Sequence, residues 1–315
     1  MINAFHFIEK KVTLLEIFLY GALLLSLFAV SGKQFAMKKC GAIAPGVFNS
    51  ACINLMRAVI CMAVSVVIWL AAGGGAANAL GHVCIALGGI GTAFNLLAWI
   101  LSSRLVSLVL LETVTTVATM VVPMLLAPVL YQGERVGLLP WLGCVLILAS
   151  LFCFMGKGEE KKEGTPLSKL LTVGLCAVSA GLATICKKYY TFYVESAGNG
   201  SSEYYTMMSF AVVLLTMLVL FAVFYGKEKK EKGKVALPYP RVWVFILIAA
   251  VCLYVAELFM VYASALPSAI YYPLNRGLST VFTFLLDVIV FKDKVTPKKL
   301  VGLIMVCAAI VLVNL

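Results

Sequence analysis

The stretch YYPLNRGLSTVFTFLLDVIVFKDKVTPKK, residues 271–299, is apolar enough to lie in a bilayer and yet carries Asn275, Arg276 and Asp287. Its polar side chains step by three or four residues and so form one stripe along a helix. An ionised side chain at bilayer depth costs about 2.5–3.5 kcal/mol, so we expect the stripe to face protein or water. It is either a functional surface or a structural pair that joins two helices. The stripe consists of Tyr272, Asn275, Arg276, Ser279, Thr280, Thr283 and Asp287.

The rest of the chain has the same apolar character. Its 315 residues are 63% hydrophobic and 12% charged, whereas soluble domains carry about 25% charged residues. A membrane-spanning helix needs about 20 apolar residues, and apolar runs recur from end to end. Breaks at 102–104 and 265–267 keep each helix within bilayer length. The predicted spans are 14–37, 46–72, 80–102, 105–131, 137–155, 169–195, 204–225, 241–264, 268–291 and 297–315, with solvated loops at 157–166 and 226–238.

Charge and cysteine content exclude several classes of protein. The formal net charge is +11, but the basic residues lie in short loops between apolar runs, which is typical of membrane orientation and not of nucleic-acid binding. The ten cysteines lie mostly inside apolar runs, without a CxxC pair or a histidine cluster. We therefore expect neither a disulfide framework nor a metal site, and no cofactor.

A short pattern occurs twice, as GERVGLLPWLGCVLILAS from residue 133 and as KDKVTPKKLVGLIMVCAA from residue 292. In both copies an acidic residue precedes a valine by two positions and a helix-opening glycine by nine. The matches predict two five-helix units, 1–156 and 167–315, joined by a charged linker at 157–166. Since five is odd, the second unit is inverted in the membrane, which is typical of secondary transporters with a central cavity. The matched pairs are Glu134 with Asp293, Gly143 with Gly302, Ser26 with Ser179, and Lys33 with Lys187.

The helix order, the Gly-Glu turn after span four, the lysines late in spans one and six, and PLNRG before FKDK resemble the drug/metabolite transporter superfamily, in particular its ten-helix EamA-like branch. The resemblance covers nearly the whole chain. It implies a carrier for small metabolites such as amino acids, nucleotide sugars or cationic drugs, with a cavity lined by both halves. Related small multidrug resistance proteins have a membrane-embedded Glu where this chain has Leu25 and Ser26, so exchange of drug and proton through that carboxylate is not expected.

Span four provides a second polar face, in which Glu112 stands at helical spacing with three threonines. We hypothesise that Glu112 and Arg276 face one cavity, where Arg276 holds a carboxylate or another anionic group and Glu112 holds an amine or a proton. Pro123 follows and can loosen the helix. The threonines are Thr115, Thr116 and Thr119.

Other polar residues within the spans are further candidates. Each either lines the cavity or bonds to a neighbouring helix, which is an ordinary structural use at about 0.6–2 kcal/mol per hydrogen bond. An electron-rich ring can also stack on a flat or cationic substrate, and Tyr272 is favoured because it lies on the polar stripe. Lysines near helix ends are expected to extend to the interface. The further candidates are Arg57, Asn95, Tyr254, Glu257 and Tyr272, and the lysines are Lys33, Lys187 and Lys188.

These features predict an integral membrane carrier of the cytoplasmic membrane that moves a small polar organic metabolite by alternating access. No GxxxxGK[ST] loop is present, so a gradient of an ion or proton is expected to supply the energy. The alternative is a membrane-embedded enzyme or scaffold, although no catalytic set stands out. The expected partners are the substrate, the bilayer, a coupling ion and a second copy of the chain. Charge bias places the termini outside the cytoplasm, whereas the family resemblance implies cytoplasmic termini.

Overall fold

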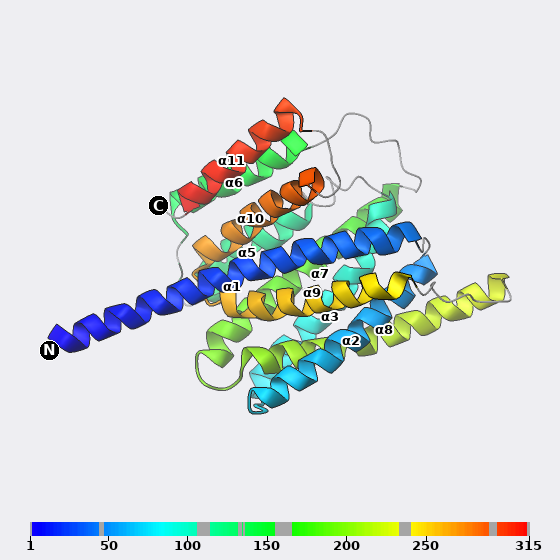
Figure 1. Ribbon diagram of the computed structural model, residues 1–315, viewed down its shortest axis with the longest axis horizontal. Coiled ribbons are helices and arrows are strands. Elements are labelled where there is room, and N and C mark those ends of the chain that lie inside the picture. The colour runs from blue at the N-terminus through cyan, green and yellow to red at the C-terminus, as the bar shows by residue number, and fades with distance from the viewer. Residues whose placement is uncertain are drawn as a thin grey trace.

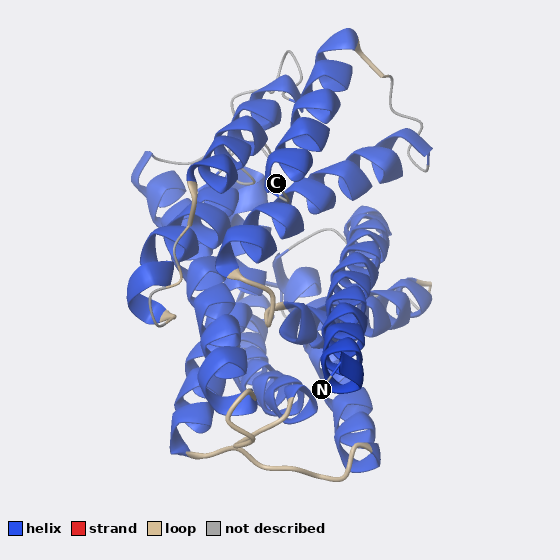
Figure 2. Cartoon of the chain, turned by 90° about the vertical axis from the view of Figure 1, so that its left-hand side faces the viewer, coloured by secondary structure: helices blue, strands red, loops and turns tan. Residues whose placement is uncertain are grey.

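The protein is helical throughout the part that the structure describes. The computed structural model describes residues 2–43, 47–105, 114–131, 134, 136–154, 166–232, 241–289 and 295–313. Within these ranges it contains helices and connecting turns and no strand (Figure 2). The helices are α1 (Ile2–Ile43), α2 (Val47–Ala71), α3 (Ala79–Leu105), η1 (Val117–Val121), α5 (Val122–Leu130), α6 (Leu138–Phe154), α7 (Pro166–Tyr190), η2 (Thr191–Glu195), α8 (Ser202–Lys232), α9 (Val242–Ala263), α10 (Ser268–Ile289) and α11 (Pro297–Val313).

Among the described residues, six helical stretches are long and apolar enough to cross a membrane: Leu15–Met37, Phe48–Ala71, Ala79–Trp99, Leu170–Glu195, Ser202–Lys230 and Val242–Ala263. The outward faces of the bundle carry large apolar side chains such as Phe28, Val129 and Val178, which are 67%, 81% and 70% exposed. The interior instead holds polar residues, among them Asn54 and Arg57. An apolar exterior around a polar interior suits a protein that is solvated by lipid.

Helices from the first half of the chain lie beside helices from the second half. Helix α1 packs along α9 and α3 along α7, while α2 packs against α8 and α6 against α11 (Figure 1). Helix α10 contacts both α11 and α1, and so joins the α6–α11 pair to the rest of the bundle. Helix α1 begins and α11 ends at the same end of the bundle (Figure 1). This arrangement brings polar faces from distant parts of the sequence together.

The observed boundaries agree with the predicted spans at several places. Helix α2 covers Val47–Ala71 and α9 covers Val242–Ala263, within a residue of the predicted ends. The predicted break at 265–267 is confirmed, because α9 ends at Ala263 and α10 begins at Ser268. Pro123 lies directly after the π-helical turn η1, in which the Val122 N–H bonds to the Val117 carbonyl. The prediction that this proline loosens the helix is therefore supported by its local geometry.

The predicted loop at 226–238 is wrong over its first part, because α8 continues to Lys232. The segment KEKKEK at 227–232 consists of strong helix formers. Glu228 and Lys232 also stand four residues apart, which favours a helix that leaves the membrane and enters water. The remainder of that loop and the linker at 157–165 lie outside the described residues.

Close approach of α3 and α7 depends on Gly91. A Cβ atom at this position would lie 2.9 Å from the Ser179 carbonyl oxygen and 3.1 Å from the Ala183 nitrogen. Both atoms belong to the α7 backbone and cannot rotate away. By contrast, a Cβ at Gly174, also on α7, would meet nothing within 4 Å.

We expect Gly91→Ala to lower the thermal stability of the purified protein, because the added methyl forces α3 and α7 apart at a cost of about 1–3 kcal/mol. The control Gly174→Ala should leave stability unchanged or raise it, since alanine favours the helix by about 0.5–1 kcal/mol. The unfolding temperature in detergent, followed by intrinsic fluorescence, provides the measurement. Equal stability of Gly91→Ala and the parent would contradict the close packing of these two helices.

Candidate functional site

Five charged side chains from five helices form the candidate site, which we call the charge cluster. They are Lys33 on α1, Arg57 on α2, Lys187 on α7, Glu257 on α9 and Arg276 on α10. Lys33 lies within electrostatic range of the other four, and Glu257 lies within range of Lys187, Lys33 and Arg57. The packing of α1 and α2 against α9 and of α10 against α1 brings four of these residues together, and the bond between Lys187 and Glu257 joins α7 to them.

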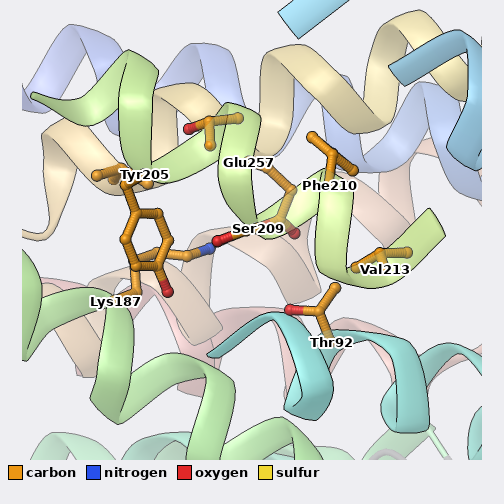
Figure 3. A pocket seen from close by; sticks show the side chains of 9 residues that line it. Thr92, Lys187, Tyr205, Ser209, Phe210, Val213 and Glu257 are labelled. Carbon is orange, nitrogen blue, oxygen red and sulfur yellow. The ribbon is translucent and has the colours of Figure 1, made fainter. Parts of the chain in front are cut away.

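The centre of the cluster is a direct ion pair between Lys187 and Glu257. The Lys187 ammonium donates a hydrogen bond of 2.6 Å to Oε2 of Glu257. The side chains are only 10% and 24% exposed, so each charge has lost most of its hydration. Such a loss is tolerated in a low-dielectric interior only when a partner of opposite sign is close. Figure 3 shows the Lys187 ammonium directed at Glu257 beside Tyr205.

Arg57 occupies the most enclosed position of the cluster, with 2% of its surface exposed. Its Nε has no hydrogen-bond partner among the described residues. The same holds for Oδ1 of Asn54, one turn earlier on α2, and for the Tyr254 hydroxyl on α9. Buried polar atoms are nearly always paired, so this group of atoms is available to a bound molecule or to water.

A small cavity adjoins the ion pair. It is lined by Thr92 of α3, by Tyr205, Ser209 and other residues of α8, and by Lys187 and Glu257 (Figure 3). Its volume of about 10 Å³ corresponds to room for one water molecule. The described residues therefore enclose the ion pair with too little space for an organic solute.

Lys188 forms a second ionic network, which we call the Lys188 network. Its ammonium lies 3.6 Å from Oε1 of Glu134 and donates to the carbonyls of Ser264, at 3.3 Å, and Leu266, at 2.7 Å. The other Glu134 oxygen accepts a 3.0 Å hydrogen bond from the Ser268 N–H, at the start of α10. The ammonium also lies 5.2 Å from the centre of the Tyr131 ring. This network connects the last turn of α7 to the α5–α6 and α9–α10 turns.

The structure separates the roles of the two adjacent tyrosines on α10. The Tyr272 hydroxyl hydrogen-bonds to the Tyr131 hydroxyl at 3.2 Å, next to the Lys188 network. Tyr271 instead lies within electrostatic range of Lys187, Glu257 and Arg276. Of the two, Tyr271 is therefore the one beside the charge cluster, although the polar stripe had favoured Tyr272.

The polar stripe and the threonine face have different surroundings. Asn275 and Arg276 of the stripe are half-buried on α10, and Arg276 belongs to the charge cluster. Thr115 and Thr116 are buried near η1, and Thr115 lies 4.0 Å from the Cys176 sulfur of α7. Asn95 of α3 donates to the Cys176 carbonyl at 3.2 Å, which is a bond between helices. Glu112, the predicted partner of Arg276, lies outside the described residues.

The prediction that Lys187 and Lys188 extend to the membrane interface is wrong. The two residues are only 8% and 1% exposed, because each ammonium has internal acceptors on α9 or on the neighbouring turns. The recurrence of lysine at Lys33 and Lys187 was the signal in the sequence for this role. In the sequence alone, this recurrence indicates duplication and does not by itself indicate a site.

The described ranges offer few groupings of metal-ligating side chains. They contain no group of three or more His, Cys, Asp or Glu side chains arranged to hold a metal ion. All ten cysteines are free thiols. The chemistry of the candidate site therefore consists of fixed charges and hydrogen-bonding groups.

Comparisons with known proteins agree with a membrane transporter. Residues 160–315 match the model of the EamA-like transporter family. No curated protein matches the chain. Among solved structures, one crystal structure aligns over 94% of this chain and 98% of its own, with a TM-score of 0.66 and 14% identity. At that identity the similarity concerns the fold alone.

The Lys188 network yields a prediction about stability. Glu134→Ala leaves a buried ammonium without its carboxylate and the Ser268 N–H without its acceptor, and we expect it to destabilise the protein by about 3 kcal/mol. Thermal unfolding of the purified protein measures the loss.

Adding Lys188→Met to this variant should recover part of the stability, since an apolar side chain of similar length needs no counter-charge. Glu16→Ala, an exposed position on α1, is the control for loss of a carboxylate. If Glu134→Ala unfolds at the same temperature as Glu16→Ala, the network does not hold these turns together.

Proposed function

The chain belongs to the EamA-like transporter family of the drug/metabolite transporter superfamily, and we propose that it is a secondary transporter that moves a small polar organic metabolite across the cytoplasmic membrane by alternating access. The charge cluster is the observation that carries the proposal. Charged groups inside a membrane protein are costly and mark the pathways of substrates and ions. Here they come from α1, α2, α7, α9 and α10 and meet in the interior of the bundle.

The proposed architecture is a pair of inverted five-helix units, 1–156 and 167–315, which together give ten membrane spans. The packing of the helices supports it. If α1, α2 and α3 correspond to α7, α8 and α9, exchange of the units converts the α1–α9 contact into the α7–α3 contact. It likewise converts α2–α9 into α8–α3, and it leaves the α2–α8 and α6–α11 pairs unchanged. This is the pattern of a two-fold axis that runs between the units, with a site near the axis.

Alternating access requires that the site open to one side of the membrane at a time. The cavity beside Lys187 has room for one water molecule, so this arrangement corresponds to a closed state. The Lys188 network lies at the end of the bundle where α1 begins, because it joins the end of α7 to two turns on that side. We take separation of these turns to be the step that opens the site toward that side.

We also propose that the protein is not an enzyme. The charge cluster contains four basic groups and a carboxylate that already bonds to one of them. Such a set holds an ion or a polar solute, whereas covalent catalysis requires a nucleophile beside a general base. The transport step draws its energy from a gradient of solute, ion or proton.

Transport is tested by solute counterflow into proteoliposomes that contain the purified full chain, with radiolabelled amino acids, nucleosides, sugars, organic acids and amines. We expect at least one class to exchange, and Arg276→Gln to slow that exchange about tenfold or more, because hydrogen bonds to charged groups contribute about 1.5–3 kcal/mol. Arg241→Gln removes an exposed guanidinium before α9 and should exchange as the parent does. Absence of exchange for every class would refute the proposal.

Orientation is a separate proposal. The basic residues concentrate on the side opposite the termini, and Lys187 and Lys188 no longer count for the termini side because they are buried. The positive-inside rule therefore places both termini outside the cytoplasm. An epitope tag after residue 315 should be accessible to antibody on intact cells. A tag that is detected only after permeabilisation would reverse this orientation.

A further inference from the structure

The charge cluster is strongly unbalanced in sign. Lys33, Arg57, Lys187 and Arg276 carry positive charge, and Glu257 lies within range of the first three, while Arg276 lies within range of Lys33. If Glu112 also reaches Arg276, as the sequence predicts, four cations still face two anions. Asp287 lies eleven residues beyond Arg276 on the same helix, which is about 16 Å at 1.5 Å per residue. The five described residues of the charge cluster therefore carry a positive excess.

A positive excess inside a membrane protein requires a counter-ion. Desolvation of each cation is offset only by a nearby anion and by saturated hydrogen bonds. The Lys187 ammonium obtains an anionic partner and a hydrogen bond from Glu257 at 2.6 Å. Arg57 does not, because its Nε lacks a partner within the described part of the chain although the side chain is 98% buried.

From this imbalance and the orphaned Arg57 donor we propose that the charge cluster binds the anionic group of the transported solute, which makes the substrate an organic anion; this inference rests on the proposed function. Arg57 and the Tyr254 hydroxyl provide donors without a partner among the described residues. Arg57 lies one turn before Cys61 on α2, and Cys61 packs in one buried cluster with Tyr254 of α9. A carboxylate or a phosphate ester matches the planar, charged donors of arginine.

Glu257 occupies the position of a bound anion, because its carboxylate already pairs with a cation of the proposed anion site. It neutralises Lys187 and lies within range of Lys33 and Arg57. An anionic solute and Glu257 therefore compete for the same cations. A cationic solute would instead depend on Glu257 as its partner, so removal of this charge has opposite effects on the two classes of ligand.

Binding is measured by calorimetric titration of the purified full chain with succinate, glycerol 3-phosphate, inorganic phosphate, glutamine, choline and sorbitol. We expect an organic anion to bind, and Glu257→Gln to tighten its binding about tenfold because one repulsive charge is removed. Arg57→Gln should weaken the same ligand about tenfold or more, and Arg57→Lys should restore part of the affinity because it keeps the charge. The control Glu16→Gln, at an exposed position on α1, should leave affinity unchanged.

Counterflow of the same compounds separates this inference from the proposed function. If choline or sorbitol binds and exchanges while the anions do not, the chain is a transporter but the anion assignment is wrong. Loss of binding in Glu257→Gln would also overturn the assignment, because Glu257 would then be the group that holds the ligand. If an organic anion binds but no compound exchanges, the anion site stands and the transport proposal fails. If inorganic phosphate is the only compound that binds, the assignment of an organic substrate is wrong.

Discussion

The ion pair between Lys187 and Glu257 is the interaction on which the interior of the bundle depends. It joins α7 to α9 across 70 residues of sequence at a distance of 2.6 Å. A buried ammonium without that carboxylate would carry a large desolvation penalty, and the reverse holds for the carboxylate. The pair therefore fixes which faces of α7 and α9 point inward. Lys33 and Arg57 then lie within range of the same carboxylate because α1 and α2 pack on α9.

Solvation by lipid explains why the polar groups collect in this way. In water, a charged side chain can face outward at little free-energy cost. In a bilayer, apolar side chains are favourable on the outer surface, and a charged side chain there is costly. The outward faces accordingly carry residues such as Val178 and Phe28. The interior receives the charged and hydroxyl side chains, and these need partners from other helices. One constraint thus produces both the apolar exterior and the crowded polar centre.

The sequence predicts the helices far better than the site. Apolar runs and turn residues determine where α2 and α9 begin and end, because span length and the placement of proline are local properties. Arg57 and Glu257 could also be selected, since a charge inside an apolar run is conspicuous. The partner of a charge could not be predicted in the same way. Periodicity shows which residues share a face of one helix, but not which helix that face meets.

Lys187 and Lys188 show how this limit arises. At the end of an apolar run, two lysines have the same sequence signature whether they reach the interface or turn inward. Their inward direction depends on acceptors that are distant in sequence. These acceptors are the Glu257 carboxylate and two backbone carbonyls of the α9–α10 turn. Helix α8 gives the opposite case: the charged segment at 227–232 is polar enough to suggest a loop, but its residues are strong helix formers and continue the helix.

The consecutive placement of these two lysines links the charge cluster to the Lys188 network. Successive residues on a helix point about 100° apart, so one turn of α7 presents Lys187 to Glu257 and Lys188 to the turns that Glu134 joins. The two contacts therefore depend on the position of the same helical turn. The π-helical segment η2 follows directly after this turn, at Thr191–Glu195. Single π-helical turns are rare and occur frequently at functional sites, which agrees with the position of η2 next to these two ionic contacts.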